Sequence, residues 1–280
     1  MSRVGVATCA GEDVDPDSPV LLAALGRGGV DAELAVWDDP NVEWGRYDLV
    51  VVRSTWDYAP RCAQFLNWAR GVPRLLNPPA VLAYSTDKHY LDDLAARGVA
   101  VVPTFYCDVG TTPEWPDGDV VVKPCVGAGS LDAERYGAPQ RAAARAHVAR
   151  LHAANRDVLI QPYVASVDEG GELALVFIDG SFSHAMVKGA MLNVPAPTRD
   201  VLFRRQQMRR AVGDPDALAL AHRVLEPFSD DELLYARVDL VRVNDQWALM
   251  ELELVEPSLF LGYDPDAATK LADALARRLA

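Results

Sequence analysis

Three acidic residues in the last third of the chain have the types and spacing of a metal site. Asp239 lies before the turn "ND", and Glu251 and Glu253 lie after it, in "ARVDLVRVNDQWALMELELVE". Such a turn predicts a hairpin, and the alternation of side chains along a strand places Glu251 and Glu253 on one face. Facing carboxylates repel one another, and a hard divalent cation such as Mg²⁺ removes this repulsion. The alternative is a solvent-facing strand with ordinary acids, which the apolar residues around them disfavour.

Two lysines are placed where they could hold an anion. Lys123 ends the apolar stretch "DVVVK" immediately before the small-residue loop "PCVGAGS", whose backbone N–H groups can approach a phosphate closely. Lys88 begins a predicted helix one segment earlier. The loop is neither a Walker A motif nor a G-x-G-x-x-G dinucleotide turn, because Asp132 occupies the last glycine position, and this disfavours a Rossmann oxidoreductase. The alternative for both lysines is a solvated surface position.

A third cluster, "RSTWDYAP" at residues 53–60, follows the apolar run "YDLVVV". Polar and aromatic side chains gathered at the carboxyl end of a buried strand are typical of ligand crevices in parallel sheets. The alternative is an ordinary loop in which Trp56 and Tyr58 anchor the core and Arg53 pairs with Asp57.

The elements that must position these clusters change character along the chain. In the first third, apolar strands at 4–9, 31–37 and 47–54 alternate with helices near 19–28 and 60–70, which indicates a parallel α/β sheet. Farther along, we predict helices near 88–97 and 139–154, a strand at 157–164, hairpins at 171–190 and 232–256, and a C-terminal helix. The chain therefore combines an α/β region with α+β regions.

Composition limits the partners of the protein. The 280 residues suffice for two or three lobes, and 27 basic against 40 acidic side chains give a net charge of −13, which repels nucleic acid and anionic membranes. No apolar stretch approaches the length of a membrane span. The sequence therefore predicts a cytoplasmic protein with no nucleic-acid or membrane partner, in which a local cluster must hold any anionic ligand. Four cysteines without a C-x-x-C pair are expected to be reduced thiols, at positions Cys9, Cys62, Cys107 and Cys125.

The order of these motifs resembles the ATP-grasp superfamily. The resemblance covers most of the chain and comprises "TDK", "VVVKP" before the glycine loop, "IQPYV", the "GELALVFIDG" hairpin, and "RVD" followed by "ELE". It implies an N-terminal pre-ATP-grasp α/β domain at 1–84 and two α+β lobes, at 85–164 and 165–280, that clasp ATP. Homodimers are common for this architecture, although no residue here specifies an interface.

The resemblance also implies roles for individual residues, with ATP and Mg²⁺ as cofactors. Mg²⁺ would be held by Asp239, Glu251 and Glu253, although the family usually has Asn at the last of these positions. Arg205 is favoured for contact with the transferred phosphate or an acidic substrate, and Lys188 is the second candidate. The basic segment around Arg205 has an alternative as an exposed helix face, and Arg237 is interpreted as a paired strand residue. Nucleotide contacts are expected from Lys88, Lys123, Gly127, Gly129, Ser130, Gln161, Tyr163, Val164 and Glu172, with the backbone of Tyr163 and Val164 facing adenine.

ATP-grasp ligases activate a carboxylate as an acyl phosphate, release ADP, and let a nucleophile displace phosphate. The motifs "RSTWDY", "SFSHAMVK" and "ELELVEPSLFL" resemble a small branch that includes the cyclo-ligases of D-cycloserine biosynthesis, which close O-ureido-D-serine to a ring. A small amino-acid substrate would then meet the first cluster, with Arg53 on its carboxylate, Ser54 and Thr55 as hydrogen-bond donors, Asp57 on its amine, and Trp56 and Tyr58 as walls. The alternatives are an intermolecular ligase that joins an amino acid to an amine, and a nucleotide-binding module without catalysis.

Overall fold

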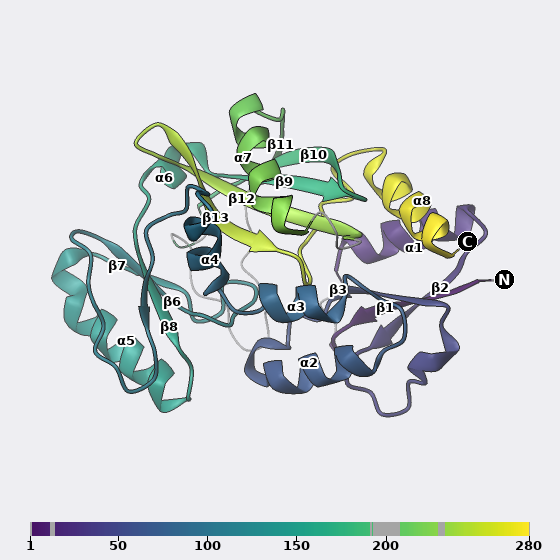
Figure 1. Ribbon diagram of the computed structural model, residues 1–280, viewed down its shortest axis with the longest axis horizontal. Helices are drawn as coiled ribbons and strands as arrows, with labels where there is room; N and C mark the ends of the chain where they lie inside the picture. Colours follow the sequence, from purple (N-terminus) through teal and green to yellow (C-terminus); the bar gives the residue numbers. More distant parts are fainter. Residues whose placement is uncertain (1, 12–14, 191, 193–207, 229–232, 280) are drawn as a thin grey trace.

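The computed structural model describes residues 2–11, 15–190, 192, 208–228 and 233–279. Three sheets form this part of the chain, and Figure 1 shows them as neighbouring lobes along the long axis. Two of the sheets are antiparallel and one is parallel. The fold is therefore the mixture of α/β and α+β that the sequence predicts.

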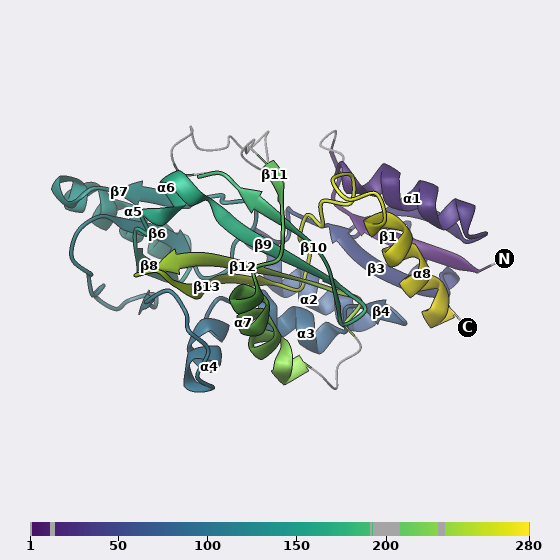
Figure 2. The same cartoon turned by 90° about the horizontal axis from the view of Figure 1, so that it is seen from above.

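The N-terminal sheet is parallel, with its strands in the order β2-β1-β3-β4. Its elements are β1 (Arg3–Thr8), α1 (Asp17–Arg27), β2 (Asp31–Val36), η1 (Trp44–Arg46), β3 (Leu49–Ser54), η2 (Ala59–Arg61), α2 (Cys62–Gly71), β4 (Leu75–Leu76) and α3 (Pro79–Ser85), joined by the C-terminal helix α8 (Ala267–Leu279). Val4, Val6 and Val51 pack with α1 and α8, whereas Val50 and Val52 pack with α2 on the other face (Figure 2). Alternate strand residues thus cover both faces of the sheet, as buried parallel strands require.

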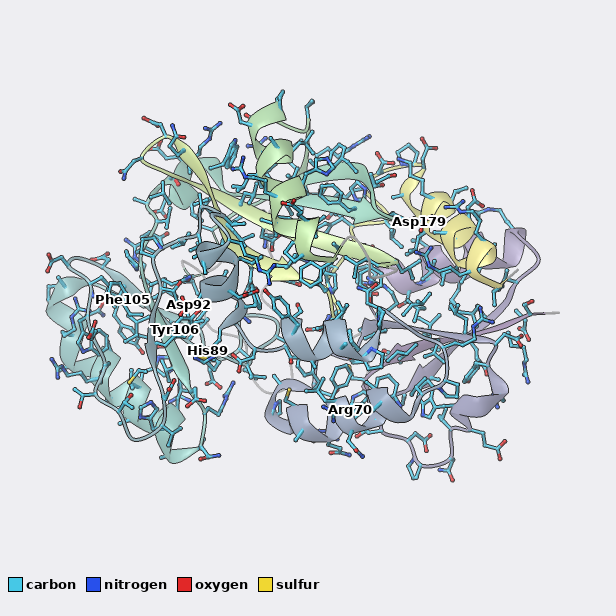
Figure 3. All side chains as sticks on the ribbon, viewed as in Figure 1. Arg70, His89, Asp92, Phe105, Tyr106 and Asp179 are labelled. Carbon is cyan, nitrogen blue, oxygen red and sulfur yellow. The ribbon has the colours of Figure 1, made fainter. Side chains whose placement is uncertain are left out.

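The central sheet is antiparallel and carries Lys123 near the end of one strand. Its strand order is β5-β8-β6-β7, and apolar residues of α5 such as Val148 and Leu151 pack against Val122 and Ile160. The elements are α4 (Tyr90–Ala96), β5 (Phe105–Cys107), β6 (Val120–Pro124), β7 (Glu134–Tyr136), η3 (Ala138–Gln140), α5 (Arg141–Ala153) and β8 (Val158–Pro162). Figure 3 shows His89, before α4, beside Tyr106 of β5, and their rings stack with centroids 4.2 Å apart.

The C-terminal sheet contains both predicted hairpins. Its order is β11-β10-β9-β12-β13. The elements are α6 (Ser166–Gly170), β9 (Glu172–Ile178), β10 (Ser181–Lys188), β11 (Met208–Ala211), α7 (Pro215–Leu225), η4 (Glu226–Phe228), β12 (Tyr235–Val243) and β13 (Gln246–Glu253). The turn residues Asp179, Gly180, Asn244 and Asp245 have φ values of 53°, 73°, 49° and 62°, as tight hairpin turns require.

The end of the chain returns to its beginning. Helix α8 packs beside α1, with Leu271 and Leu275 in the same core as Leu21 and Leu25. Asp179, in the β9–β10 turn, lies beside α8 in Figure 3 and accepts a hydrogen bond of 2.6 Å from Arg277. The predicted C-terminal helix therefore packs its leucines in the core and joins the N-terminal sheet to the C-terminal sheet.

Candidate active site

A cavity lies where the three sheets meet. The N-terminal region contributes Trp56 and Tyr58 to its wall, the central region contributes Lys123, and the C-terminal region contributes Glu251 and Glu253. Predicted site residues from distant parts of the sequence thus line one space.

The β12–β13 register brings the three predicted metal ligands together. Asp239 lies directly opposite Glu251, and Arg237 lies opposite Glu253. Pairing from the turn would place Asp239 opposite Met250, but a β-bulge between Asp239 and Leu240 shifts the register by one residue. Because directly opposed residues share a face of the sheet, the bulge is what turns the glutamates toward Asp239. One oxygen from each carboxylate lies within 4.8 Å of the others.

Four cations surround these acids. Lys188 Nζ lies 2.6 Å from Asp239 Oδ2 and 2.9 Å from Glu172 Oε2, so the β10 lysine joins two strands. Arg237 pairs with Asp239 at 3.0 Å and also with Glu253.

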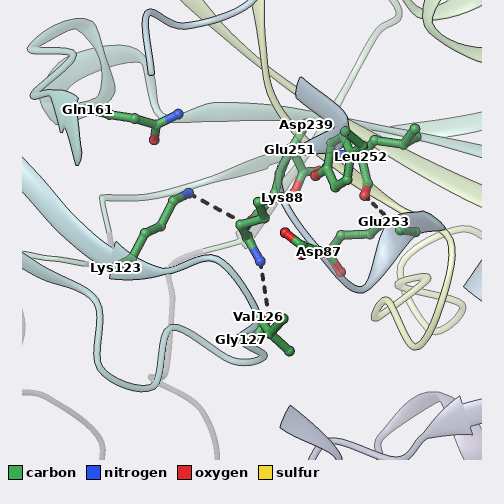
Figure 4. A network of polar contacts seen from close by, with 12 residues as sticks. Asp87, Lys88, Lys123, Val126, Gly127, Gln161, Asp239, Glu251, Leu252 and Glu253 are labelled. Carbon is green, nitrogen blue, oxygen red and sulfur yellow. Dashed lines mark hydrogen bonds and ion pairs between the residues drawn. The ribbon is translucent and has the colours of Figure 1, made fainter. Parts of the chain in front are cut away.

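The other two cations are the predicted nucleotide lysines. Lys88 Nζ lies 3.2 Å and Lys123 Nζ lies 3.5 Å from Glu251 Oε1, and Lys88 also donates to the carbonyl of Gly127 at 3.1 Å (Figure 4). The two lysines therefore lie together at the cavity, and Lys88 is joined to the glycine loop.

Burial and these cations set the protonation of the acids. Burial alone would raise the pKa of Glu251, but Lys123 and Lys88 outweigh it and hold that pKa below its usual range. The pKa of Asp239 is lowered in the same way. Burial would raise it, but Arg237 and Lys188 outweigh burial. Burial raises the pKa of Glu253, although Arg237 opposes the shift. Glu251 and Asp239 are therefore the two acids that stay ionised most readily.

This donor set suits a hard divalent cation. All three ligands offer carboxylate oxygen, which Mg²⁺ prefers, and their spacing allows one ion to contact all three. The residues present thus fit the Mg²⁺ that the sequence predicts.

The glycine loop and the 161–164 stretch also line the cavity. Gly127, Gly129 and Ser130 line it. Farther along the loop, Asp132 accepts hydrogen bonds from Arg150 at 2.9 Å and Arg156 at 2.6 Å, which anchors the loop to the central lobe.

Gln161, Tyr163 and Val164 line the same cavity. The N–H of Tyr163 donates to the carbonyl of Asp119 at 2.9 Å, so this N–H is already used and cannot serve the expected adenine contact. Gln161 donates to the Thr104 hydroxyl at 2.9 Å.

The "RSTWDYAP" cluster divides into two groups. Trp56 and Tyr58 line the cavity, whereas Arg53, Ser54, Thr55 and Asp57 are not among the described residues that do. The expectation that all six side chains face a substrate is therefore not met. The alternative pairing of Arg53 with Asp57 is also wrong, since Arg53 lies beside acids of the α1 end and Asp57 pairs elsewhere.

Three of the four residues outside the cavity, Arg53, Ser54 and Asp57, have protein partners for their side chains. Asp57 accepts a 2.8 Å hydrogen bond from Trp37 Nε1 and pairs with Arg61. The hydroxyl of Ser54 lies 2.8 Å from that of Thr8, and Thr55 is fully buried.

Arg53 holds the backbone of the segment that follows β13. Its Nη2 donates to the Pro257 carbonyl at 2.7 Å, and Asp17 accepts from the N–H groups of Leu259 and Leu261, each at 2.7 Å. Side chains from two lobes thus fix the backbone of residues 256–261, which we call the 256–261 segment. The side chains that hold it are Asp17, Arg53, Trp56, His184 and Arg237.

Two site residues were missed in the sequence. The sequence predicts that Arg237 is a paired strand residue, and the structure places it in the cavity wall as well as in ion pairs. Glu256 lines the cavity and is only 8% exposed. The position of Arg237 two residues before Asp239 was a usable signal, whereas Glu256 had none beyond following "ELELV". Arg205, the favoured catalytic arginine, lies outside the described residues.

Comparison with known proteins agrees with this geometry. Residues 4–77 match the family described as D-cycloserine synthetase DcsG, N-terminal domain. Cycloserine biosynthesis protein DcsG from Streptomyces lavendulae is 42% identical over 288 aligned positions, which cover 95% of each chain. This chain belongs to the DcsG family. The crystal structure of D-cycloserine synthetase DcsG superposes with a TM-score of 0.86 at 38% identity over 100% of both chains.

More distant structures share the fold of the DcsG family. A D-alanine–D-alanine ligase from Bacillus anthracis, solved with ATP, has a TM-score of 0.70 at 13% identity over 100% of this chain and 97% of its own. An ATP-grasp RimK domain protein from Sphaerobacter thermophilus has a TM-score of 0.70 at 18% identity, over 98% and 100%. The predicted ATP-grasp fold is thereby confirmed. Among the described residues, no helix is both long and apolar enough to span a membrane.

Proposed function

We propose that this chain is an ADP-forming ligase that activates a small amino-acid carboxylate and cyclises O-ureido-D-serine to D-cycloserine. The observation that carries the proposal is the 42% identity to DcsG along 95% of the chain. The cavity gives chemical support, because cations and carboxylates from three lobes surround one space. Phosphoryl transfer needs such a set, since its catalysis rests on positioning and on neutralising charge.

ATP lies in this proposal between the central and C-terminal lobes. Lys88 and Lys123 neutralise its phosphates, and the backbone of the loop at 127–130 covers them. Their contacts with Glu251 support this role, because the lysine side chains are already directed into the cavity. Gln161, Tyr163, Val164 and Glu172 contact the rest of the nucleotide. Asp239, Glu251 and Glu253 would hold Mg²⁺, which would supply positive charge to neutralise phosphate oxygens.

The chain's own residues then direct two bond changes. A carboxylate oxygen of the substrate takes the γ-phosphoryl group and ADP leaves, with Lys188 and Arg237 placed to stabilise the transferred charge, assisted by Arg205. The nitrogen bonded to the side-chain oxygen attacks the acyl carbon, closes the ring and expels phosphate, which takes up the proton that the nitrogen loses. Hydrolysis of the carbamoyl group to carbon dioxide and ammonia completes the reaction. Enclosure protects the acyl phosphate from water, and ring closure within one molecule favours cyclisation over attack by a second amine.

The regions 1–84, 85–164 and 165–280 act in this proposal as the substrate domain, the central nucleotide lobe and the metal-bearing lobe. A cytoplasmic location is supported by four cysteines that form no disulfide. Self-association as a homodimer completes the proposal, and light scattering tests it by distinguishing one 30.5 kDa chain from two.

The test is ADP release by the purified protein with Mg-ATP and an amino-acid panel that includes O-ureido-D-serine, with products identified by mass spectrometry. ADP together with D-cycloserine is the expected result. A linear conjugate with a second amino acid would identify an intermolecular ligase, and no ADP with any substrate would refute a ligase. Lys123→Met should lower kcat/KM by about 100-fold or more, whereas the exposed control Lys270→Met should behave like the wild type.

A further inference from the structure

One acid in the cavity wall has no cationic partner. Four carboxylates line the cavity within the described residues, and three of them form ion pairs with lining cations. The fourth, Glu256, forms neither an ion pair nor a side-chain hydrogen bond with any residue that the structure describes. The three paired acids are Glu172, Glu251 and Glu253.

Glu256 is nevertheless buried and firmly positioned. It is 8% exposed and lines the cavity, and its backbone carbonyl accepts a 3.2 Å hydrogen bond from Trp56 Nε1. The next residue, Pro257, is held by Arg53 at 2.7 Å. A buried carboxylate without a partner is costly unless a ligand supplies the missing charge. The backbone contacts keep this group at a fixed place, as a binding site requires.

The protonation of Glu256 agrees with a missing cation. Burial raises its pKa well above the usual range and the neighbouring Glu253 adds to the shift, whereas Lys88 and Arg237 oppose it without cancelling it. A positive charge placed beside a carboxyl group favours its ionised form and reverses such a shift.

The geometry points to Glu256 as the residue that binds the ammonium group of the substrate. This inference rests on the proposed function and names a subsite of the same cavity. Lys88, Lys188 and Arg237 line the same cavity as Glu256, so a ligand whose ammonium lies at Glu256 can direct its carboxylate toward these cations. In an α-amino acid, the nitrogen and the carboxyl carbon are bonded to the same atom, which suits these neighbouring subsites. Trp56 and Tyr58 form the adjoining wall for the rest of the ligand.

Asp57, the residue that the sequence suggested for the amine, is unsuited to it. It is engaged with Trp37 and Arg61 and is not among the described residues that line the cavity. If Glu256 binds the ammonium group, only Glu256→Gln should lose the preference for a substrate that carries it. If Asp57 binds the group, only Asp57→Asn should lose that preference.

The test compares O-ureido-D-serine with 3-(ureidooxy)propanoate, which differs only in lacking the ammonium group. ADP release gives kcat/KM for both compounds in the wild type, Glu256→Gln, Asp57→Asn and the exposed control Glu43→Gln. The wild type should prefer the ammonium compound by about 30-fold or more, the loss expected when one partner of a buried charge pair is removed. Glu256→Gln should reduce that preference to about threefold or less, with KM for ATP unchanged.

Preservation of the preference in Glu256→Gln, or its loss in Asp57→Asn alone, would overturn the inference. An equal loss on both compounds would also overturn it, because it would show a structural role.

If the wild type releases no ADP from either compound, the proposed function fails by itself. Thermal shifts with D-serine and D-glycerate in the presence of Mg-AMPPNP then decide the subsite. A shift with D-serine alone that Glu256→Gln abolishes would support it, and no ammonium-dependent shift would reject it.

Discussion

Replacing Arg53 by methionine distinguishes two roles for this residue at the end of β3. Either Arg53 stabilises the fold, or it binds the substrate. Arg53 is 1% exposed, and its Nη2 lies 3.8 Å from Asp17 and 4.0 Å from Asp15 while donating to Pro257 at 2.7 Å. Arg53→Met preserves the apolar stem but leaves two buried carboxylates without their cation. Removing one partner of a buried ion pair costs about 3–5 kcal/mol. We expect the free energy of unfolding to fall by that amount and Tm to fall by roughly 6 to 15 °C.

Calorimetry and urea denaturation measure this loss. The matched control is Arg61→Met, because Arg61 also pairs with aspartates of the same region but its side chain is 35% exposed. Exposed ion pairs contribute about 0–1 kcal/mol, so this variant should melt within a few degrees of the wild type. If Arg53→Met melts like the wild type and loses turnover, Arg53 binds substrate and does not position the 256–261 segment.

Three further predictions concern the positions around the site. Gly171 has φ +74°, and an added Cβ would lie 2.5 Å from the Lys188 carbonyl, so Gly171→Ala should destabilise the fold by about 2 kcal/mol or more; an unchanged urea midpoint would contradict this. Glu251→Gln should raise the Mg²⁺ concentration for half-maximal ADP release about tenfold or more, and an unchanged Mg²⁺ dependence would exclude Glu251 as a ligand. Burial lowers the pKa of His184, whose Nε2 donates to the Leu259 carbonyl at 2.9 Å. The unfolded chain then binds the proton more readily than the folded chain. The stability that neutral His184 gives to the folded state is therefore fully present above the unfolded pKa of about 6.5, and it is lost as pH falls below that value. His184→Gln should therefore show a smaller stability loss between pH 7.5 and 5 than the wild type, and equal losses would disprove the assignment.

The sequence predicted the hairpins that carry the site, but it did not predict the register in which β12 and β13 pair. Both hairpins could be predicted because turn residues of fixed conformational preference separate runs of strand-forming residues. Asp239 and Glu251 could be grouped by the chemistry that their types suggest. Strict pairing about the turn, however, places Asp239 opposite Met250. The bulge that corrects this depends on tertiary packing, and no local sequence preference specifies it.

The same limit applies to the "RSTWDYAP" cluster. Its place at the carboxyl end of a parallel strand was predictable, and Trp56 and Tyr58 do line the cavity. Which side chains of an irregular turn face a ligand depends on partners far away in the sequence. Arg53 pairs with Asp17, more than 30 residues before it, and donates a hydrogen bond to Pro257, more than 200 residues after it. Neither partner can be recognised from the sequence of the cluster.

The unusual glutamate at position 253 is explained by the residue across the hairpin. The resemblance to ATP-grasp ligases predicts asparagine there, and a third carboxylate would add repulsion to Asp239 and Glu251. Arg237 lies opposite Glu253 in the register and pairs with both Glu253 and Asp239, so the added charge meets a local cation. Burial still raises the pKa of Glu253, whereas the two lysines hold that of Glu251 low. Glu251 is therefore the acid best prepared to hold a metal ion in the proposed site, whereas Glu253 already has Arg237 as its partner.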